Sequence, residues 1–214
     1  MSEGLFITFE GGEGTGKSLQ AKLLHEYLVE SGEDAVLTRE PGGTPVAEEI
    51  RKILVTGTPE KIGPLTESLL YLASRADHWM KKIKPLLDIG TVVVCDRFQD
   101  SSIVYQGVGK NVNTLLLNAI YNDFASGRQP DRTYLLDLDV DIGIARSLRN
   151  GQNTEARYEK MELIYHEKVR QGFLELARAN PQRFYILDGM LSEHDIHKLV
   201  VADLRKFLQT LTNY

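Results

Sequence analysis

Short apolar runs alternate along the chain with longer stretches in which apolar residues recur at helical spacing. The runs are rich in β-branched and aromatic residues, which is typical of buried strands: 5–9, 35–38, 91–95, 133–138 and 183–187. Helical spacing covers 17–31, 45–55, 65–88, 113–126, 140–149, 155–179 and 193–211. Because strands and helices take turns, the pattern predicts an α/β fold with a parallel sheet covered by helices on both faces. Ligands of such sheets bind at the carboxyl ends of the strands.

The length of the chain favours one folding unit. A chain of 214 residues can bury most of its apolar surface in a single core. Because no internal repeat or low-complexity tract interrupts the pattern, we expect one domain over residues 1–214. The polar stretch "RSLRNGQNTEARY" (146–158) has little to bury, and we expect a mobile lid there.

Charge and composition exclude several classes of protein. The formal net charge of −5 gives no basic footprint, which argues against nucleic acid as a partner. The start "MSEGLFITFE" lacks the regions of a secretion signal, and no apolar run approaches the roughly 18 residues of a membrane span. We therefore expect a cytoplasmic protein. Cys95 is the only cysteine, so it forms no intramolecular disulfide, and we expect it to be a small buried strand residue.

The first strand runs into a Walker A pattern, Gly11-x-x-x-x-Gly16-Lys17-Ser18, that opens a helix. In this context, glycines let backbone N–H groups approach phosphate oxygens, and the helix N-terminus adds partial positive charge. Lys17 would reach the β and γ phosphates, and Ser18 would offer its hydroxyl to Mg²⁺. We therefore expect a bound nucleoside triphosphate, ATP or GTP, with Mg²⁺. Its predicted binding residues are Gly11, Gly12, Glu13, Gly14, Thr15, Gly16, Lys17, Ser18 and Leu19.

A second chemical signal, Asp96-Arg97, follows the third strand. An aspartate at this position beside a Walker loop can hold a Mg²⁺-bound water, and an arginine can grip a phosphate at two points. Taken alone, the pair is equally typical of a surface ion pair that caps a turn. The Walker pattern upstream favours the functional interpretation.

The sequence resembles the thymidylate kinase family in four segments. The segments "FEGGEGTGKS", "TREPGGT" (38–44), "LLYLASR" (69–75) and "DRFQDSSIVYQG" (96–107) match that family's motifs in order. The last is the most specific, since a general P-loop protein would share only the first. The resemblance implies a P-loop NTPase fold like that of nucleoside monophosphate kinases, with a five-stranded parallel sheet. It also implies a homodimer that phosphorylates dTMP to dTDP with ATP and Mg²⁺, for dTTP synthesis.

The resemblance also implies residue roles at the acceptor nucleotide. Tyr71 would stack on thymine, Arg75 would donate to its O4, and Arg97 would bind the phosphate. Spacing alone would equally allow Tyr71 to be core and Arg75 a solvated helix end. The Glu40-Pro41 bond is expected to be cis, as in the family. The predicted acceptor-binding residues are Glu13, Arg39, Arg51, Tyr71, Arg75, Arg97, Ser102, Tyr105 and Gln106.

Glu13 lies inside the Walker loop, where a carboxylate would repel phosphate unless it points outward, toward the acceptor. One branch of the family has an arginine at the next position, but this chain has Gly14. The resemblance therefore assigns the compensating charge to lid arginines, for which Arg146, Arg149 and Arg157 are the candidates. The first two could instead merely favour a helix C-terminus. The predicted catalytic residues are Lys17, Arg97, Arg149 and Arg157, and the predicted metal ligands are Ser18 and Asp96.

The chain departs from the family pattern in the lid, where Ala156 stands in place of the aspartate that usually precedes the arginine. Tyr71 replaces a more frequent phenylalanine, so its hydroxyl needs a partner. The acceptor phosphate is already ionised near neutral pH, so no general base is required, and the five histidines are interpreted as surface or helix residues. Two alternatives stay open: a kinase for another small acceptor, such as dUMP or a deoxynucleoside, and a non-catalytic nucleotide-binding protein.

Overall fold

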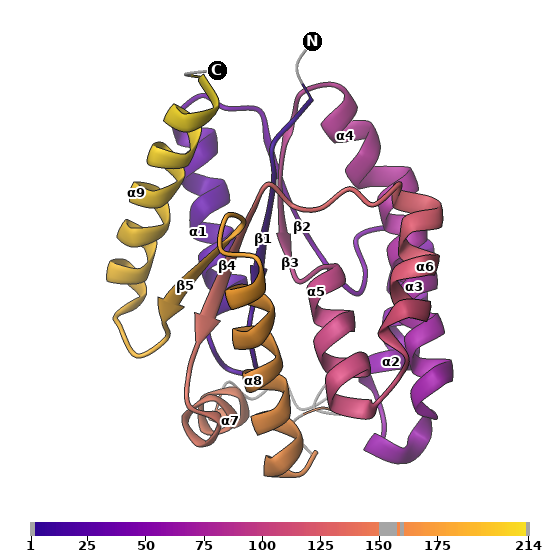
Figure 1. Ribbon diagram of the computed structural model, residues 1–214. Coiled ribbons are helices and arrows are strands. Elements are labelled where there is room, and N and C mark those ends of the chain that lie inside the picture. The colour runs from indigo at the N-terminus through magenta and orange to yellow at the C-terminus, as the bar shows by residue number, and fades with distance from the viewer. Residues whose placement is uncertain (1–2, 150–157, 159–160, 213–214) are drawn as a thin grey trace.

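The computed structural model describes residues 3–149, 158 and 161–212 of the chain (Figure 1). Its centre is one parallel sheet in the order β2-β3-β1-β4-β5. The strands are β1 (Phe6–Glu10), β2 (Ala35–Arg39), β3 (Val92–Asp96), β4 (Arg132–Asp137) and β5 (Phe184–Asp188). Because β1 pairs with β3 on one side and β4 on the other, the order reverses at β1. A crevice therefore opens at its carboxyl end.

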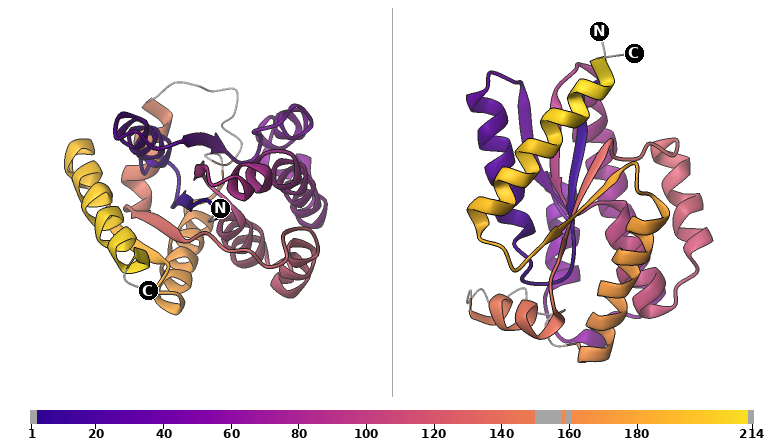
Figure 2. Two further views of the ribbon diagram at one scale, coloured as in Figure 1. Left: turned by 90° about the horizontal axis from the view of Figure 1, so that it is seen from above. Right: turned by 60° about the vertical axis from the view of Figure 1, so that its left-hand side comes forward.

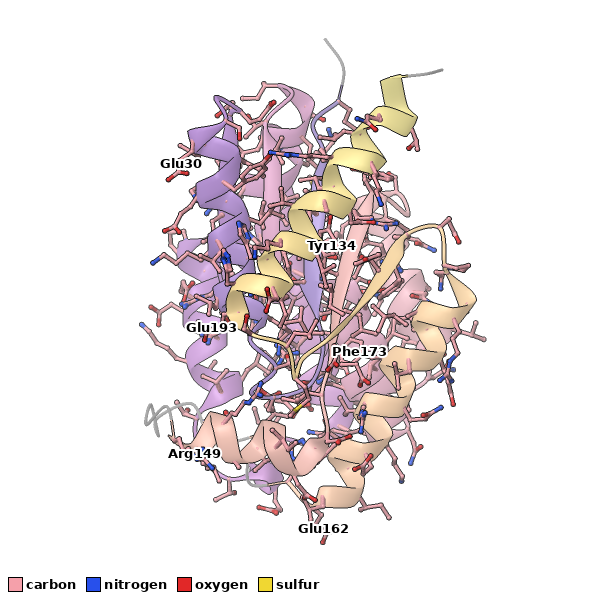
Figure 3. All side chains as sticks on the ribbon, turned by 90° about the vertical axis from the view of Figure 1, so that its left-hand side faces the viewer. Glu30, Tyr134, Arg149, Glu162, Phe173 and Glu193 are labelled. Atoms are coloured by element: carbon pink, nitrogen blue, oxygen red, sulfur yellow. The ribbon has the colours of Figure 1, made fainter. Side chains whose placement is uncertain are left out.

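Two helices cover one face of the sheet, namely α1 (Lys17–Glu30) and α9 (Glu193–Thr212). Leu24 of α1 and Val200 of α9 pack on the inward side chains of the strands, including Phe9 and Tyr134. Figure 3 shows Tyr134 beneath α9. These side chains are nearly fully buried, so this layer fixes α1 and the Walker loop that precedes it against the sheet.

A second layer of helices covers the opposite face, as the view from above in Figure 2 shows. Its buried side chains form two clusters, one around Trp79 and Phe98 and one around Tyr105 and Phe173. The elements are α3 (Pro64–His78), the π-helix η2 (Trp79–Ile83), α4 (Lys84–Asp88), α5 (Gln99–Ser102), the π-helix η3 (Ile103–Val108), α6 (Thr114–Ala125) and α8 (Leu163–Ala179).

Three further elements complete the described chain: α2 (Pro45–Val55), the 3₁₀-helix η1 (Pro59–Lys61) and α7 (Val140–Arg149). The start of α2 shows how local sequence sets a boundary. Thr44 accepts a hydrogen bond from the Ala47 amide, and Pro45 occupies the first helical position, where no amide donor is needed. Helix α7 lies below the carboxyl ends of the strands in Figure 1, so it borders the crevice.

The predicted strands are confirmed to within one residue at each end, and Cys95 is fully buried in β3 as expected. The helix predicted over 155–179 is wrong at its start, because Glu162 has an extended backbone and α8 begins at Leu163. The helix predicted over 65–88 is interrupted by η2. None of the described helices is long and apolar enough to cross a membrane.

The sequence pattern missed the helical segment 99–108, which is formed by α5 and η3. The first residues of this segment are polar, so no apolar periodicity marks them. They are nevertheless buried, because residues elsewhere in the fold form hydrogen bonds with them. Asp100, for example, pairs with Arg183 at 2.6 Å.

Candidate active site

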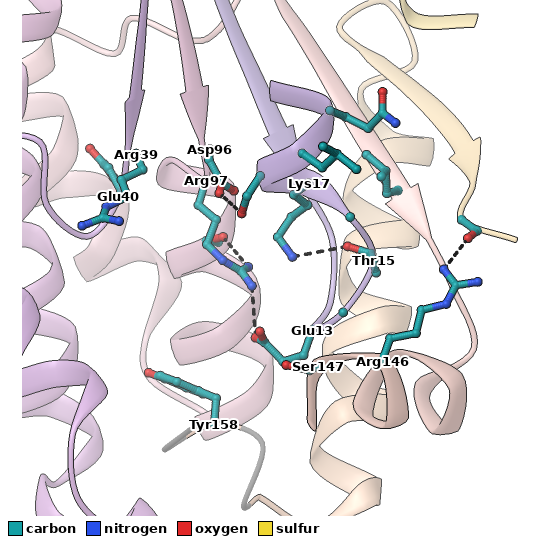
Figure 4. Close-up of a pocket in the computed structure, with 18 of the residues that line it drawn as sticks. Glu13, Thr15, Lys17, Arg39, Glu40, Asp96, Arg97, Arg146, Ser147 and Tyr158 are labelled. Carbon is teal, nitrogen blue, oxygen red and sulfur yellow. Dashed lines mark hydrogen bonds and ion pairs between the residues drawn. The ribbon is translucent and has the colours of Figure 1, made fainter. Parts of the chain in front are cut away.

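A cavity of about 1120 Å³ lies at the carboxyl ends of the strands (Figure 4). It is lined by the turn before α1, the ends of β2 and β3, and side chains of α2, α3, α5, η3 and α7. Of the predicted site residues that the structure describes, all except Gly11 and Gly12 line it. Arg157 lies outside the described residues. The cavity therefore brings together side chains predicted from widely separated motifs.

The Walker turn requires glycine at two positions, because a backbone carbonyl of another segment lies close to each of them. Gly11 has φ +139°, and a Cβ there would lie 2.4 Å from the carbonyl oxygen of Leu136. Gly14 has φ +64°, and a Cβ would lie 1.9 Å from the carbonyl oxygen of Gly143 in α7. Because α7 packs directly on the turn, position 14 has no room for an arginine or any other side chain.

Lys17 is buried at the start of α1 and points back into its own turn. Its ammonium donates hydrogen bonds to the carbonyl of Gly12 and to the hydroxyl of Thr15, the latter at 3.3 Å (Figure 4). Burial and the nearby charge of Arg97 lower its pKa to about 8, although Glu13 opposes the shift. Lys17 is therefore charged at neutral pH, and its ammonium lies within the Walker turn.

Ser18 and Asp96 form a pair of oxygen ligands beside the Walker turn. The Ser18 hydroxyl donates a hydrogen bond to one carboxylate oxygen of Asp96. The other oxygen, Oδ1, is buried and has no hydrogen-bond partner among the described residues. A hydroxyl and a carboxylate with an unused oxygen suit Mg²⁺. No group of three or more acidic, histidine or cysteine side chains in the described chain could hold a metal, so the cation would also need phosphate or water oxygens.

Arg97 stands in the left-handed backbone region, with φ +68°. One of its terminal nitrogens donates to the carbonyl of Gly11 at 3.1 Å, and the other to Glu13 at 3.0 Å. Its guanidinium carbon lies 4.9 Å from the centre of the Tyr105 ring. A residue held in this uncommon conformation at the edge of a cavity is a functional candidate, because surrounding contacts must maintain it.

Glu10 supplies those contacts, although the sequence analysis gave it no role and ended the predicted strand at residue 9. It is fully buried and accepts hydrogen bonds from the Phe98 amide at 2.8 Å and from the Ser101 hydroxyl at 2.6 Å. Burial and the charge of Asp100 raise its pKa to about 7. Glu10 thereby fastens the turn that carries Arg97 to the end of β1.

The carboxylate of Glu13 lies on the Arg97 side of the Walker turn, in the direction predicted from the sequence (Figure 4). Tyr105 donates its hydroxyl to the same carboxylate at 2.7 Å. Burial would raise the pKa of Glu13, but the charges of Arg97 and Lys17 outweigh it and hold the pKa below its ordinary value. Glu13 therefore stays ionised between the two cations and reduces their mutual repulsion.

Arg75 is buried in a network that the sequence did not reveal. Its Nε donates to Glu40 at 2.6 Å, and its terminal nitrogens donate to Gln99, to Ser102 and to the carbonyl of Phe98 at 2.7–3.0 Å. The same carboxylate of Glu40 also bonds His78, which is the last residue of α3 and is fully buried. Arg75 lines the cavity, but these partners leave it little freedom to turn.

A second buried network surrounds Glu67. Lys110 pairs with it at 2.7 Å, and both Gln106 and Tyr158 donate hydrogen bonds to it. Tyr158 also serves as the partner that the Tyr71 hydroxyl needs, and burial raises the pKa of Tyr71 to about 12. The buried side chain of Tyr158 is thus part of the cavity wall, although the sequence assigned its segment to a mobile lid.

Arg39 and Arg51 stand at the outer rim of the same half of the cavity. Arg39 is exposed and pairs with Glu48 at 3.2 Å, whereas Arg51 donates to the carbonyl of Pro41 at 2.9 Å. The Glu40-Pro41 bond is cis, as the resemblance implied. These arginines are placed around the loop that the "TREPGGT" motif forms.

The other half of the cavity contains residues that the sequence interpretation missed. The segment 189–192 lines it directly after β5, where the rule on strand ends could have found it. Arg146 donates to the carbonyl of Gly189 at 2.8 Å (Figure 4). Arg146 and Arg149 belong to the last turn of α7 rather than to a loop, which corrects the predicted start of the lid at 146. Arg149 is exposed at the end of α7 (Figure 3).

Comparison with known proteins agrees with this geometry. The family model for thymidylate kinase matches residues 9–200. A thymidylate kinase of Geobacter sp. (strain M21) is 44% identical over 213 residues, covering 97% of this chain and 94% of that protein. One of Geobacter sulfurreducens is 48% identical over 191 residues, covering 87% and 89%. The crystal structure of thymidylate kinase from Ehrlichia chaffeensis matches with a TM-score of 0.75 at 34% identity, covering 95% of this chain and 99% of that one. By sequence and by fold, this chain belongs to the thymidylate kinase family.

Proposed function

We propose that this chain transfers the terminal phosphoryl group of ATP to dTMP across the cavity, which yields dTDP and ADP. The observation that carries the proposal is that one cavity is lined by two separate groups of cationic side chains and backbone donors, one on each side of Glu13. Lys17 and the Walker turn make the donor end, together with Arg146 and the segment 189–192. Arg97, with the side chains around Tyr71, makes the acceptor end.

At the donor end, the phosphates of ATP would lie on the backbone amides of the Walker turn, near the ammonium of Lys17. The rest of the cavity on this side is bordered by Arg146 and the segment 189–192. The nucleoside part of ATP would therefore extend toward them. Phosphate binding would require the Lys17 ammonium to release the loop oxygens to which it donates.

At the acceptor end, Arg97 would bind the phosphate of dTMP and Tyr71 would stack on its base. A guanidinium group suits a phosphate because it offers two parallel donors. Arg39 and Arg51 add positive charge at the rim, and Tyr105 would lie against the sugar. A nucleoside without a phosphate would leave these cations unmatched, which favours a monophosphate as the acceptor.

Mg²⁺ would be held by Ser18 and Asp96, whose unused carboxylate oxygen supports the assignment. When bound, it would neutralise the charge that builds up on the transferred phosphate. The protein's own contribution is to align two anions and to keep them apart from water. None of the described site residues needs to act as a general base, since the acceptor phosphate is already ionised near neutral pH.

Arg149 and Arg157 would supply positive charge to the transferred group, because Gly14 leaves the Walker turn without an arginine. Arg149 lines the cavity from the end of α7. An arginine that contacts the transition state typically contributes several kcal/mol to catalysis, so this role is testable by turnover.

We also propose that the protein acts in the cytoplasm as a homodimer. An apolar face on α3 and α6, which pack side by side, supports the second copy as its occupant. Its exposed residues include Leu69, at 45%, and Leu115, at 77%. Sedimentation velocity should give a dimer for the natural sequence and a monomer for Leu115→Glu. A monomer in both would contradict the dimer.

The reaction is tested by an acceptor panel with ATP and Mg²⁺. We expect ADP release with dTMP, weaker or no release with dUMP and dCMP, and none with thymidine. A nucleotide-binding protein without activity would release no ADP with any acceptor, and a nucleoside kinase would prefer thymidine. A Lys17→Met variant serves as the control, because its ADP release reports any contaminating kinase.

A further inference from the structure

Two helical stripes face each other at the acceptor end of the cavity. On α3, Glu67 and Arg75 lie one turn to either side of Tyr71. On the segment formed by α5 and η3, Ser102 and Gln106 are also one turn apart. Cross-contacts join the stripes on both sides of Tyr71: Arg75 donates to Ser102 at 2.7 Å, and Gln106 donates to Glu67 at 3.0 Å. A base stacked on Tyr71 would thus have one of these two contacts at either edge.

Among the side chains that meet at Glu67, only Glu67 itself cannot donate a hydrogen bond when it is ionised. Its side chain is fully buried, and it accepts from Lys110 at 2.7 and 2.8 Å and from the Tyr158 hydroxyl at 2.8 Å. Burial would raise its pKa, but the hydrogen bonds from Lys110, Gln106 and Tyr158 outweigh burial and keep the pKa below its ordinary value. Glu67 therefore remains a carboxylate at neutral pH.

This charge dictates which way the amide of Gln106 points. Only the NH₂ group of an amide can donate, so it must face Glu67, and it also reaches the Tyr158 hydroxyl at 3.2 Å. The carbonyl oxygen of Gln106 has no hydrogen-bond partner among the residues that the structure describes, and the residue lines the cavity. The wall therefore offers an acceptor at this position.

Arg75 offers the opposite polarity on the same wall. Four hydrogen bonds, to Glu40, Gln99, Ser102 and the carbonyl of Phe98, occupy four of the five N–H donors of its guanidinium. One donor on the nitrogen that bonds Phe98 remains. Arg75 and Gln106 both line the cavity, and they keep one donor and one acceptor respectively without a partner among the described residues.

We propose that Glu67 is a positioning residue for base selection, because it fixes the amide of Gln106 with its oxygen toward the cavity. An acceptor beside a donor matches a pyrimidine edge in which a ring N–H adjoins a carbonyl, as in thymine and uracil. Cytosine has a bare ring nitrogen beside an amino group, so both contacts would become mismatched. The inference rests on the proposed function, since it concerns the acceptor of that reaction.

The test is Glu67→Gln, measured as the ratio of kcat/KM for dTMP to kcat/KM for dCMP. In this variant Lys110, which can only donate, holds the oxygen of the new amide. The NH₂ group of the new amide then faces Gln106, whose amide must turn to accept from it. We expect the ratio to fall at least tenfold, because a mismatched buried polar contact typically changes specificity by this much. KM for ATP should stay within about twofold, since the donor end is untouched.

Two further variants keep the result interpretable. Glu67→Gln combined with Lys110→Met removes both charges, so it tests the idea if the single variant does not fold. There Gln106 loses its fixed orientation, and the ratio should still fall. Adding Gln106→Leu to Glu67→Gln should lower the ratio no further, because Glu67 acts through Gln106. Asp203→Asn with Arg132→Met removes a comparably buried ion pair away from the cavity, and it should leave the ratio unchanged.

An unchanged ratio in a folded Glu67→Gln variant would overturn the inference and leave Glu67 with a purely structural role. The same conclusion would follow if the loss in ratio added fully to that of Gln106→Leu. Failure of the proposed function looks different, because the natural sequence itself would then release no ADP with dTMP.

Discussion

The phosphate-binding part of the donor end is one continuous loop with the start of α1, whereas the acceptor end is assembled from four distant segments. Nearly all the groups that would face the ATP phosphates are backbone amides of the turn before α1, with Lys17 at its end. The groups that would face dTMP come from the loop after β2, from α2 and α3, and from the segment after β3. A continuous motif can be recognised in a sequence, but an assembled one depends on the fold that brings its parts together.

The two ends also differ in how their charges are balanced. Lys17 has neutral oxygens as hydrogen-bond partners, and its pKa is lowered to about 8. Arg75 and Arg97 are each paired with a carboxylate, Glu40 and Glu13 respectively. The donor end should therefore respond to pH and to its ligand, whereas the buried ion pairs of the acceptor end should hold its side chains in place before dTMP binds.

The largest expected effect comes from removing the guanidinium group of Arg97, which pairs with Glu13 at the acceptor end. Arg97→Ala should lower kcat by about 10³-fold, roughly 4 kcal/mol in barrier, because it removes a donor to the reacting phosphates. Calorimetric affinity for ATP should survive, since the Walker turn is intact. Arg178→Ala, an exposed position on α8, is the matched control. Unchanged turnover in Arg97→Ala would contradict the assigned role.

Arg75 tests whether the acceptor end is preorganised by its buried pairs. Arg75→Met should raise KM for dTMP by about 10²-fold and lower stability by roughly 3–5 kcal/mol, because Glu40 is left as an unpaired buried charge. Adding Glu40→Gln should restore much of the melting temperature but not the affinity for dTMP. Recovery of both together would mean that Arg75 serves only to fold the protein.

Variants of Arg149 and Arg157 test catalysis separately from binding. Arg149→Ala and Arg157→Ala should each lower kcat about tenfold or more while KM for dTMP stays nearly constant, because they would act on the transferred group. Steady-state kinetics with both substrates varied gives the two constants. A rise in KM with unchanged kcat would instead make these arginines binding residues.

The smallest effect is the pH dependence of ATP binding at the donor end. The pKa of Lys17 is lowered from 10.5 to about 8, so the side chain is charged at pH 7 and loses its proton as pH rises through 8. ATP favours the charged form, so its affinity should fall above pH 8, by about tenfold per pH unit at most. Calorimetry from pH 7 to 9.5 measures this, with Lys17→Met as the flat control. A constant affinity would rule out the shift.

This contrast explains what the sequence could predict. The strands, most helices and the Walker turn follow from local patterns, and the roles of Arg75 and Gln106 came only from resemblance to a family. The sequence analysis missed Glu40, Glu67 and Lys110, because a buried charge leaves no periodic signal. Such a charge is tolerated only where a residue distant in the sequence forms an ion pair or hydrogen bond with it. Only the folded structure brings such partners into contact.

The central claim is that two nucleotides meet at Glu13, with dTMP on the side of Arg97. A crystal structure with dTMP and a non-hydrolysable ATP analogue tests this most directly. We expect the dTMP phosphate within hydrogen-bonding distance of Arg97, its base on Tyr71, and the analogue's phosphates on the Walker turn. A thymine nucleotide bound elsewhere, with the space between Tyr71 and Arg97 closed by packed side chains, would contradict the account.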